Sequence, residues 1–156
     1  MKIAVDTNWL VAAYFIKLDQ PRSETVVRFS ERCDLPWIVS LPALLEARGV
    51  FSFYGGSTAS VERKKLQADL GTTLLVASTP WEDIAKKTEE LSDRFSTKAR
   101  LGMVDLMILA SALKAEATHF LSFDSNSNLR ALASVLKLKV FPELTADDRR
   151  RAAALR

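Results

Sequence analysis

The sequence predicts an α/β domain in which helices cover both faces of a parallel sheet. Short apolar runs, several of them rich in β-branched residues, alternate with longer segments whose apolar residues recur at helical spacing. The chain has 156 residues, of which 48% are hydrophobic, and this suits the core of one ordinary domain. Because helices connect the successive strands, we expect the strands to run parallel, with binding sites beyond their carboxyl ends.

The expected strands are short and apolar, and they lie at residues 2–6, 37–40, 72–76, 119–123 and 138–141. The intervening segments predict a helix from residue 7 onward and further helices at 23–32, 42–54, 59–70, 80–95, 103–115 and 128–136. Pro42 suits the first turn of its helix, and Gly55 and Gly56 mark the end of that helix. The segment 103–115 is apolar around nearly its whole circumference, which predicts a central helix packed on both sides.

Two peripheral segments are basic. Residues 96–102 predict a loop that carries Lys98 and Arg100, which are candidates for phosphate contact, although a solvated loop is the simpler interpretation. We expect one domain over residues 1–142, followed at 143–156 by a basic helix or tail with Thr145 as a possible N-cap. This terminal segment could touch RNA, but a solvated or frayed helix explains it more simply.

Composition narrows the possible sites. The formal charge of +3 and the pI near 9.1 tolerate a polyanionic partner but fall well short of a protein that coats nucleic acid. A single cysteine, Cys33, excludes an internal disulfide, and a single histidine, His119, excludes a site built from several imidazoles or thiolates. No apolar run approaches the roughly 18 residues of a membrane span, so we expect a soluble, cytoplasmic protein.

Four acidic residues sit where apolar runs break off: Asp6, Glu46, Asp105 and Asp124. A carboxylate against hydrophobic neighbours needs a cation or hydrogen-bond donors, because burying it alone costs several kcal/mol. No lysine or arginine follows Asp6 or Asp124 within four residues. Asp6 and Asp124 end predicted strands, and Glu46 and Asp105 are expected in the first turns of helices. All four can therefore reach one edge of the sheet.

Each acid has a simpler explanation when it is taken alone. Asp6 and Asp124 could be helix or turn caps, and Asp105 could complement a helix dipole, whereas Glu46 interrupts an apolar helix row with no base three or four residues away on that row. Together, however, four carboxylates would repel one another unless cations compensate their charge. This donor set favours one or two Mg²⁺ or Mn²⁺ ions, and paired metals are a common device for cleaving phosphodiesters.

The sequence also resembles the PIN domain family. The resemblance rests on VDTNWLV, on Glu46, on ARLGMVDLMILASAL and on FLSFD, with spacings of 40, 59 and 19 residues between the four acids. It spans residues 2–142 and is closest to the toxin ribonucleases of prokaryotic VapBC toxin–antitoxin pairs. It implies a three-layer α/β/α sandwich, Mg²⁺- or Mn²⁺-dependent endoribonuclease activity, a small cognate antitoxin protein as partner, and a homodimer.

The resemblance also assigns roles to residues. Asp6, Glu46, Asp105 and Asp124 match the acidic quartet of the metal site. Asp6, Asp105 and Asp124 would hold the metal directly, and Glu46 would do so either as a ligand or through a metal-bound water. The metal lowers the pKa of a water and makes a histidine base unnecessary. Thr7 and Asn8 match the polar residues after the first acid, and Ser122 matches the hydroxyl before the last, so they would orient the ligands or a phosphate. Asn8 could equally be a local backbone cap. Met103 and the segment DSNSNL depart from the family by lacking aromatics, which affects the subgroup and no ligand.

Three other functions also use or tolerate clustered acids, and each meets a difficulty in this sequence or depends on exposed aromatic residues. A haloacid-dehalogenase-like phosphatase needs a second aspartate two residues after the first, where this chain has Asn8, and gives Glu46 no role. A receiver-type phosphoacceptor needs paired acids near the start of the chain, which are absent. A PIN-like binding module without cleavage would act through partners, for which exposed aromatics among Trp9, Phe51, Phe53, Tyr54 and Trp81 could provide contacts, although we expect most of these in the core.

Overall fold

A computed structural model describes residues 1–33 and 36–156. Within these residues, five parallel strands form one sheet in the order β3-β2-β1-β4-β5. The strands are β1 (Ile3–Val5), β2 (Trp37–Val39), β3 (Leu74–Val76), β4 (His119–Leu121) and β5 (Lys139–Phe141). The predicted parallel α/β architecture is confirmed, and each strand is shorter than expected by one or two residues at its ends.

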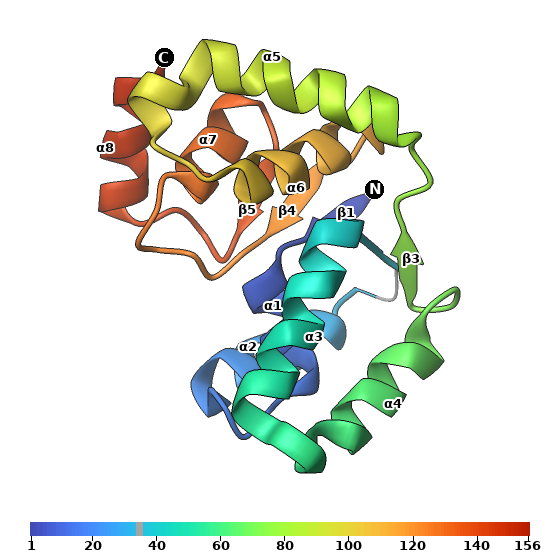
Figure 1. Ribbon diagram of the computed structural model, residues 1–156. Helices are drawn as coiled ribbons and strands as arrows, with labels where there is room; N and C mark the ends of the chain where they lie inside the picture. The colour runs from blue at the N-terminus through green and yellow to red at the C-terminus, as the bar shows by residue number, and fades with distance from the viewer. Residues whose placement is uncertain (34–35) are drawn as a thin grey trace.

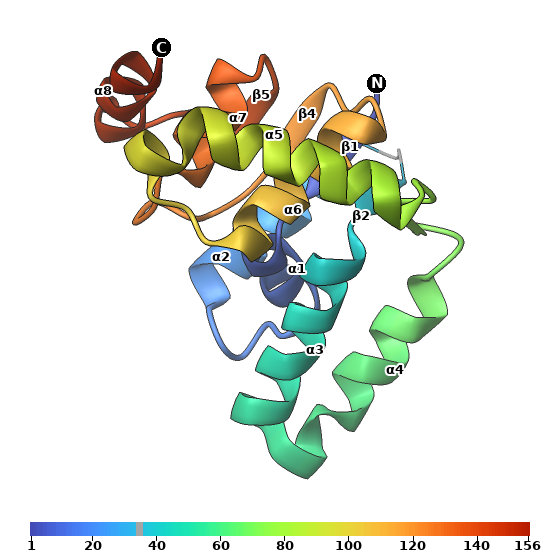
Figure 2. The same cartoon turned by 45° about the horizontal axis from the view of Figure 1, so that its top comes forward.

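Helices cover both faces of this sheet (Figures 1 and 2). One layer contains α1 (Thr7–Tyr14), α2 (Gln20–Ser30), α3 (Leu41–Gly55), a 3₁₀ turn (Gly56–Ala59) and α4 (Ser60–Asp69). The other layer contains α5 (Trp81–Ala99), α6 (Met103–Lys114), α7 (Leu129–Val135) and α8 (Ala146–Leu155). The domain is therefore a three-layer α/β/α sandwich. None of the described helices is both long and apolar enough to cross a membrane.

The strand order places a topological switch point between β1 and β4. From β1 the chain adds β2 and β3 on one side and then returns to add β4 and β5 on the other. The two central strands are in register, with Val5 paired to Leu121 at their carboxyl ends. In open parallel sheets, ligands bind in the crevice beyond such a switch point. The fold thus directs attention to the residues that follow Val5 and Leu121.

The core beside this edge is aromatic. Trp9 of α1 is fully buried and stacks on Phe123, with ring centroids 4.8 Å apart and an interplanar angle of 13°. The edges of Phe29, Trp37 and Phe141 pack around the same indole. Offset stacking and edge-to-face contacts are the arrangements that aromatic pairs prefer. This cluster ties α1 to the segment that leaves β4.

The expectation that most of the aromatic group lies in the core is wrong for three of its five members. Trp9 and Phe51 are fully buried, but Phe53, Tyr54 and Trp81 are 81%, 62% and 56% exposed. Phe53 and Tyr54 contact each other edge to face at the end of α3. They lie in the last turn of α3, just before Gly55 and the C-cap Gly56.

Two differences from the predicted elements concern basic residues. Helix α5 continues to Ala99, which is buried, so Lys98 lies on a helix and the expected loop shrinks to residues 100–102. Arg100 ends α5 in the left-handed conformation, with φ of 51°. The helical spacing of the apolar residues Phe95 and Ala99 continues through this turn. The sequence did not predict the extra turn because Ala99 is the only apolar residue among polar ones.

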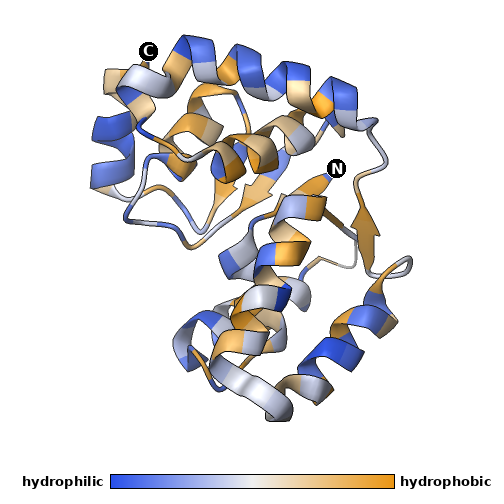
Figure 3. Cartoon of the chain, viewed as in Figure 1, coloured by the Kyte–Doolittle hydropathy of each residue, from blue (hydrophilic) through white to orange (hydrophobic). Residues whose placement is uncertain are grey.

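The C-terminal helix α8 is docked on the domain. Thr145 is its N-cap and forms a capping box with Asp148, as the sequence predicted in part. The expectation of a solvated or frayed terminus is wrong, because Ala152 and Leu155 are buried against the layer that contains α5 and α7. Figure 3 shows why the sequence misled: hydrophilic residues make up much of α8, and only a few of its residues are apolar.

Candidate active site

The structure places all four predicted acids in one pocket at the switch point. The pocket has a volume of about 430 Å³, and its lining includes Asp6, Glu46, Asp105 and Asp124 together with Thr7 and Asn8. Asp6 directly follows β1, and Asp124 lies three residues after β4. Glu46 comes from α3 and Asp105 from the first turn of α6. Residues from four elements, up to 118 positions apart, thus line the same cavity.

Asp6 lies at the floor of this site. Its side chain is 3% exposed, and each carboxylate oxygen accepts a hydrogen bond. The backbone N–H of Thr7 donates to Oδ1 at 2.7 Å, so Asp6 also caps α1, and the hydroxyl of Ser122 donates to Oδ2 at 2.7 Å. The capping interpretation and the site interpretation therefore describe the same side chain.

Ser122 and Asn8 join the two central strands beyond the sheet. Ser122 is fully buried, and its hydroxyl accepts a hydrogen bond from the backbone N–H of Asp124 at 3.1 Å while donating to Asp6. The amide oxygen of Asn8 accepts from the backbone N–H of Phe123 at 2.8 Å. Asn8 is therefore not a local cap, because its partner lies 115 residues away. Both side chains fix the segment that carries Asp124.

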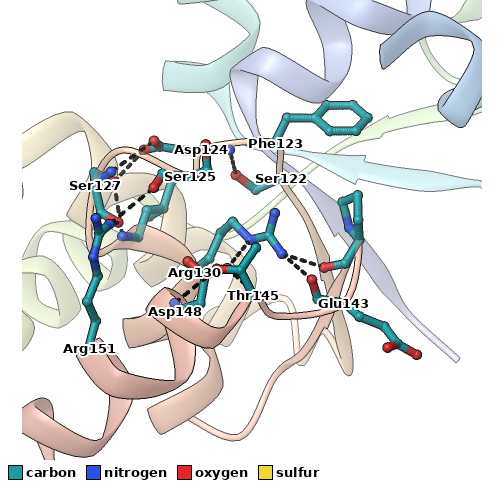
Figure 4. A network of polar contacts seen from close by, with 12 residues as sticks. Ser122, Phe123, Asp124, Ser125, Ser127, Arg130, Glu143, Thr145, Asp148 and Arg151 are labelled. Carbon is teal, nitrogen blue, oxygen red and sulfur yellow. Dashed lines mark hydrogen bonds and ion pairs between the residues drawn. The ribbon is translucent and has the colours of Figure 1, made fainter. Parts of the chain in front are cut away.

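Asp124 is held by the loop that follows it (Figure 4). Its Oδ1 accepts hydrogen bonds from the backbone N–H groups of Asn126 and Ser127, both at 3.1 Å, and its Oδ2 accepts one from the hydroxyl of Ser127. This is the turn geometry that the simpler interpretation of DSNSN predicted. The carboxylate is half-buried, and the same geometry presents it to the pocket.

Glu46 differs from the expectation in two ways. It is the sixth residue of α3, so it lies in the second turn and not the first, and its side chain is exposed. The argument that it must be compensated because apolar neighbours surround it is therefore wrong, since it faces the open pocket and not the core. Its Oε2 accepts a 2.6 Å hydrogen bond from the hydroxyl of Thr7, which orients it toward the Asp6 end of α1.

Asp105 is half-buried at the N-terminal end of α6. Burial raises its pKa, and the negative charges of Asp124 and Glu46 raise the pKa further, while a backbone hydrogen bond at Gly102 lowers it. Burial likewise raises the pKa of Asp6 to about 7; hydrogen bonds from Ser122 and Thr7 oppose this shift, and the charges of Asp105 and Asp124 add to it. Repulsion from neighbouring carboxylates thus adds to burial in disfavouring the charged forms of Asp6 and Asp105.

A divalent cation would relieve this repulsion, and the donor set fits Mg²⁺ or Mn²⁺, since it consists of carboxylate oxygens around one pocket. As the side chains lie, no three histidine, cysteine, aspartate or glutamate residues in the described part of the chain are grouped to hold one ion. Glu46 and Asp124 have bonds to hydroxyl groups that they can exchange for a cation. The carboxylate donor set therefore fits a divalent metal in its chemistry.

Metal-free protein should lose stability as the pH rises from about 4 to about 7. The folded state binds the Asp6 proton more tightly than the unfolded chain does, because burial raises the pKa from its ordinary 3.8 to about 7. Unfolding then releases a proton in this window, and each step upward in pH favours the unfolded state. Asp6→Asn should lack this contribution and gain stability relative to wild type between pH 4 and 7. Urea unfolding in EDTA at a series of pH values measures the free energy of unfolding of both proteins. The same pH dependence in wild type and in Asp6→Asn would contradict the assignment.

Arg22 is a residue of the pocket that the sequence did not indicate. It extends from α2 to the pocket lining, with its guanidinium 5.5 Å from the ring centre of Phe123 and its Nε 3.2 Å from Asp19. Nothing in the sequence around Arg22 marks it, because its place over Phe123, 101 residues further along the chain, depends on tertiary packing. By contrast, Lys98 lies in a separate pocket, beside Arg94 and Arg156.

The fold and the pocket together define an α/β/α domain with an acidic site at the switch point of its sheet. The family model of the PIN domain matches residues 3–135, and the chain belongs to the PIN domain family. PIN domains are generally metal-dependent nucleases, so the family indicates a protein that cleaves nucleic acid. Membership of this family argues against the haloacid-dehalogenase-like phosphatase and the receiver-type phosphoacceptor. No curated protein matched the sequence when it was compared with them.

Proposed function

We propose that the protein is a Mg²⁺- or Mn²⁺-dependent endoribonuclease whose metal is held by Asp6, Glu46, Asp105 and Asp124, with one or two ions bound. The observation that supports this most strongly is the convergence of four carboxylates on one pocket, where burial and mutual repulsion raise the pKa values of Asp6 and Asp105. The free-energy cost of holding these carboxylates charged and close together is expected at a functional site, and a bound cation would offset it.

The chain's own residues prepare this site. Ser122 and the backbone of Thr7 hold the Asp6 carboxylate, the hydroxyl of Thr7 orients Glu46, and Asn8 fixes the segment that leads to Asp124. A bound divalent cation lowers the pKa of a water molecule and neutralises charge that develops on a phosphate. No histidine takes part, because His119 begins β4 and so lies at the opposite end of that strand from the pocket.

Arg22 would supply the positive charge for the substrate. Its guanidinium lies over Phe123 at the pocket that the acids line, and it is about 43% exposed. Arginine suits phosphate recognition because its planar group donates two parallel hydrogen bonds. We assign Arg22 to the phosphate next to the scissile bond.

We further propose that the protein is the toxin of a toxin–antitoxin pair, cytoplasmic, inhibited by a small antitoxin protein, and a homodimer. The support is the resemblance to VapC-type toxins and the exposed apolar surface of α3. Tyr54 lines the pocket while remaining exposed, and it contacts the exposed Phe53, so a partner that covers these rings would also cover the site. Leu41 and Leu45, nearer the start of α3, are also exposed.

Cleavage of a pool of structured RNAs tests the enzyme proposal. Purified protein should cut RNA with Mg²⁺ or Mn²⁺, should be inactive in EDTA, and should regain activity when the metal is restored. Cleavage of single-stranded DNA of matching sequence, compared with cleavage of the RNA, shows whether the protein distinguishes ribose from deoxyribose. Metal-independent cleavage, or no cleavage of any RNA in the pool with either metal, would contradict the proposal.

A binding module that has lost cleavage is the second candidate. It is favoured by the absence, among the described residues as their side chains lie, of three ligands already grouped for one ion. Binding of the RNA pool without any cleavage, unchanged by metal or EDTA, would support this candidate over the nuclease.

A further inference from the structure

A continuous set of polar contacts links the C-terminal helix α8 to Asp124 (Figure 4). Arg151, in the second turn of α8, donates from Nη1 to the backbone oxygen of Ser127 at 2.6 Å and to that of Ser125 at 3.2 Å. These two residues belong to the loop whose N–H groups and hydroxyl bind the Asp124 carboxylate. The contact joins two parts of the chain that are 24 and 26 residues apart.

The loop itself is held from two sides. On one side, Asn126 and Ser127 donate to Asp124, and the hydroxyl of Ser127 accepts from the N–H of Leu129 at the start of α7. On the other side lies Arg151. Ser125 and Asn126 are exposed, so side-chain packing does little to fix this turn. Hydrogen bonds from a charged donor to the loop carbonyls therefore restrict its backbone strongly.

Helix α8 is anchored independently of Arg151. Arg130 of α7 and Asp148 of α8 are 4% and 0% exposed, and Nε of Arg130 lies 3.4 Å from Oδ2 of Asp148. Arg130 also donates from Nη2 to the backbone oxygens of Pro142 at 2.6 Å and Glu143 at 2.8 Å. The buried pair fixes the first turn of α8 and the segment before it. Arg151 follows one turn later on this anchored helix.

We propose that Arg151 is a positioning residue for Asp124, and that α8 serves the active site by bracing the loop of residues 125–127. This inference rests on the proposed function, in which Asp124 binds the metal. The family match ends at residue 135, so the brace belongs to a part of this chain beyond the matched domain. Residues that orient a metal ligand typically change metal affinity by 10-fold to 100-fold when they are replaced.

Loss of Arg151 has a specific consequence for this site. The carbonyls of Ser125 and Ser127 become solvated, the loop gains backbone freedom, and the N–H groups of Asn126 and Ser127 are no longer held toward Asp124 in one arrangement. Metal binding must then order the loop, and this entropy cost weakens the affinity. The docking of α8 should survive, because Arg130, Asp148, Ala152 and Leu155 remain buried.

The test compares Arg151→Gln with Arg150→Gln, which removes the same charge from the same helix. Arg150 is exposed and pairs with Asp147, so its replacement leaves the loop untouched. Mn²⁺ affinity measured by electron paramagnetic resonance should fall about 10-fold in Arg151→Gln and stay unchanged in Arg150→Gln. In metal-free protein, hydrogen exchange at the Ser127 amide should accelerate only in Arg151→Gln, while both variants keep the wild-type melting temperature.

Arg151→Lys provides a second variant, because it keeps the charge and one hydrogen bond, and it should restore part of the Mn²⁺ affinity. An unchanged Mn²⁺ dissociation constant in Arg151→Gln, or Ser127 exchange equal to wild type, would overturn the inference. Failure of wild-type protein to cleave RNA would instead overturn the proposed nuclease, and it would leave these two measurements to decide the role of Arg151 at the metal site.

Discussion

Replacing Asp105 by asparagine should lower the rate of RNA cleavage roughly 10³-fold at saturating Mg²⁺. Asp105 lies within the electrostatic reach of Asp124 and Glu46 as well as Asp6, so it stands at the centre of the carboxylate group. Loss of one charged ligand removes several kcal/mol of charge stabilisation, and each 1.36 kcal/mol corresponds to about tenfold in rate. Single-turnover cleavage of a labelled RNA measures the effect.

The fold should tolerate this change. Asparagine has nearly the same shape as aspartate, and its amide oxygen can accept the backbone hydrogen bond at Gly102. The lost interaction with the helix dipole, about 0.5 kcal/mol, opposes the gain from removing a repelled charge. Asp93→Asn is the matched control, since Asp93 is exposed on α5. Equal cleavage rates for Asp105→Asn and Asp93→Asn would show that this carboxylate takes no part in catalysis.

Trp9→Ala should remove about 4 kcal/mol from the free energy of unfolding. The indole is fully buried and contacts four other aromatic rings, so truncation leaves a large cavity that these rings cannot fill by small shifts. Such a loss is a large fraction of the 5–15 kcal/mol that stabilises an ordinary domain. Urea unfolding in EDTA, followed by circular dichroism, measures the change without interference from metal binding.

Trp81→Ala is the control for this prediction. Trp81 is 56% exposed at the start of α5, where a surface substitution should change the unfolding free energy by no more than about 0.5 kcal/mol.

Trp9→Ala should also weaken Mn²⁺ binding, because Phe123, which stacks on Trp9, lies between Ser122 and Asp124. A loss below about 1 kcal/mol in Trp9→Ala would mean that the aromatic cluster does not hold this edge of the sheet together.

The sequence predicted the place of the site better than its internal contacts. Asp6 and Asp124 could be placed because strand ends are readable from short apolar runs, and parallel strands bring their carboxyl ends to one edge. The local sequence pattern around a residue does not show which residue far away in the chain its side chain will contact. The bond from Asn8 to Phe123, the orientation of Arg22, and the contact of Arg151 with Ser127 all depend on tertiary packing.

The exposure of Glu46 illustrates the same limit. Its sequence neighbours are apolar, but a helix has several faces: Ala43, Leu44 and Ala47 are buried, whereas Glu46 itself is exposed and lines the pocket. Burial was therefore the wrong argument for a residue that the structure nevertheless places with the other acids. The terminal helix shows the reverse error, since three buried side chains, Asp148, Ala152 and Leu155, dock a segment that looks solvated by composition.

The structure also explains how a highly charged site can exist in a stable domain. Each of the two acids beside the central strands has hydrogen-bond donors that come from its own turn or from the neighbouring strand end. These donors offset part of the cost of burial, and the remaining cost appears in the raised pKa values of Asp6 and Asp105. Under the proposed function, a divalent cation in the pocket would offset this remaining cost.

Anomalous diffraction from crystals soaked in Mn²⁺ tests this central claim most directly. The account predicts one or two manganese peaks inside the pocket lined by Asp6, Glu46, Asp105 and Asp124, with carboxylate oxygens as ligands, and no peak there in crystals of Asp105→Asn. An empty pocket at a Mn²⁺ concentration that supports RNA cleavage, or manganese bound only elsewhere on the chain, would contradict it.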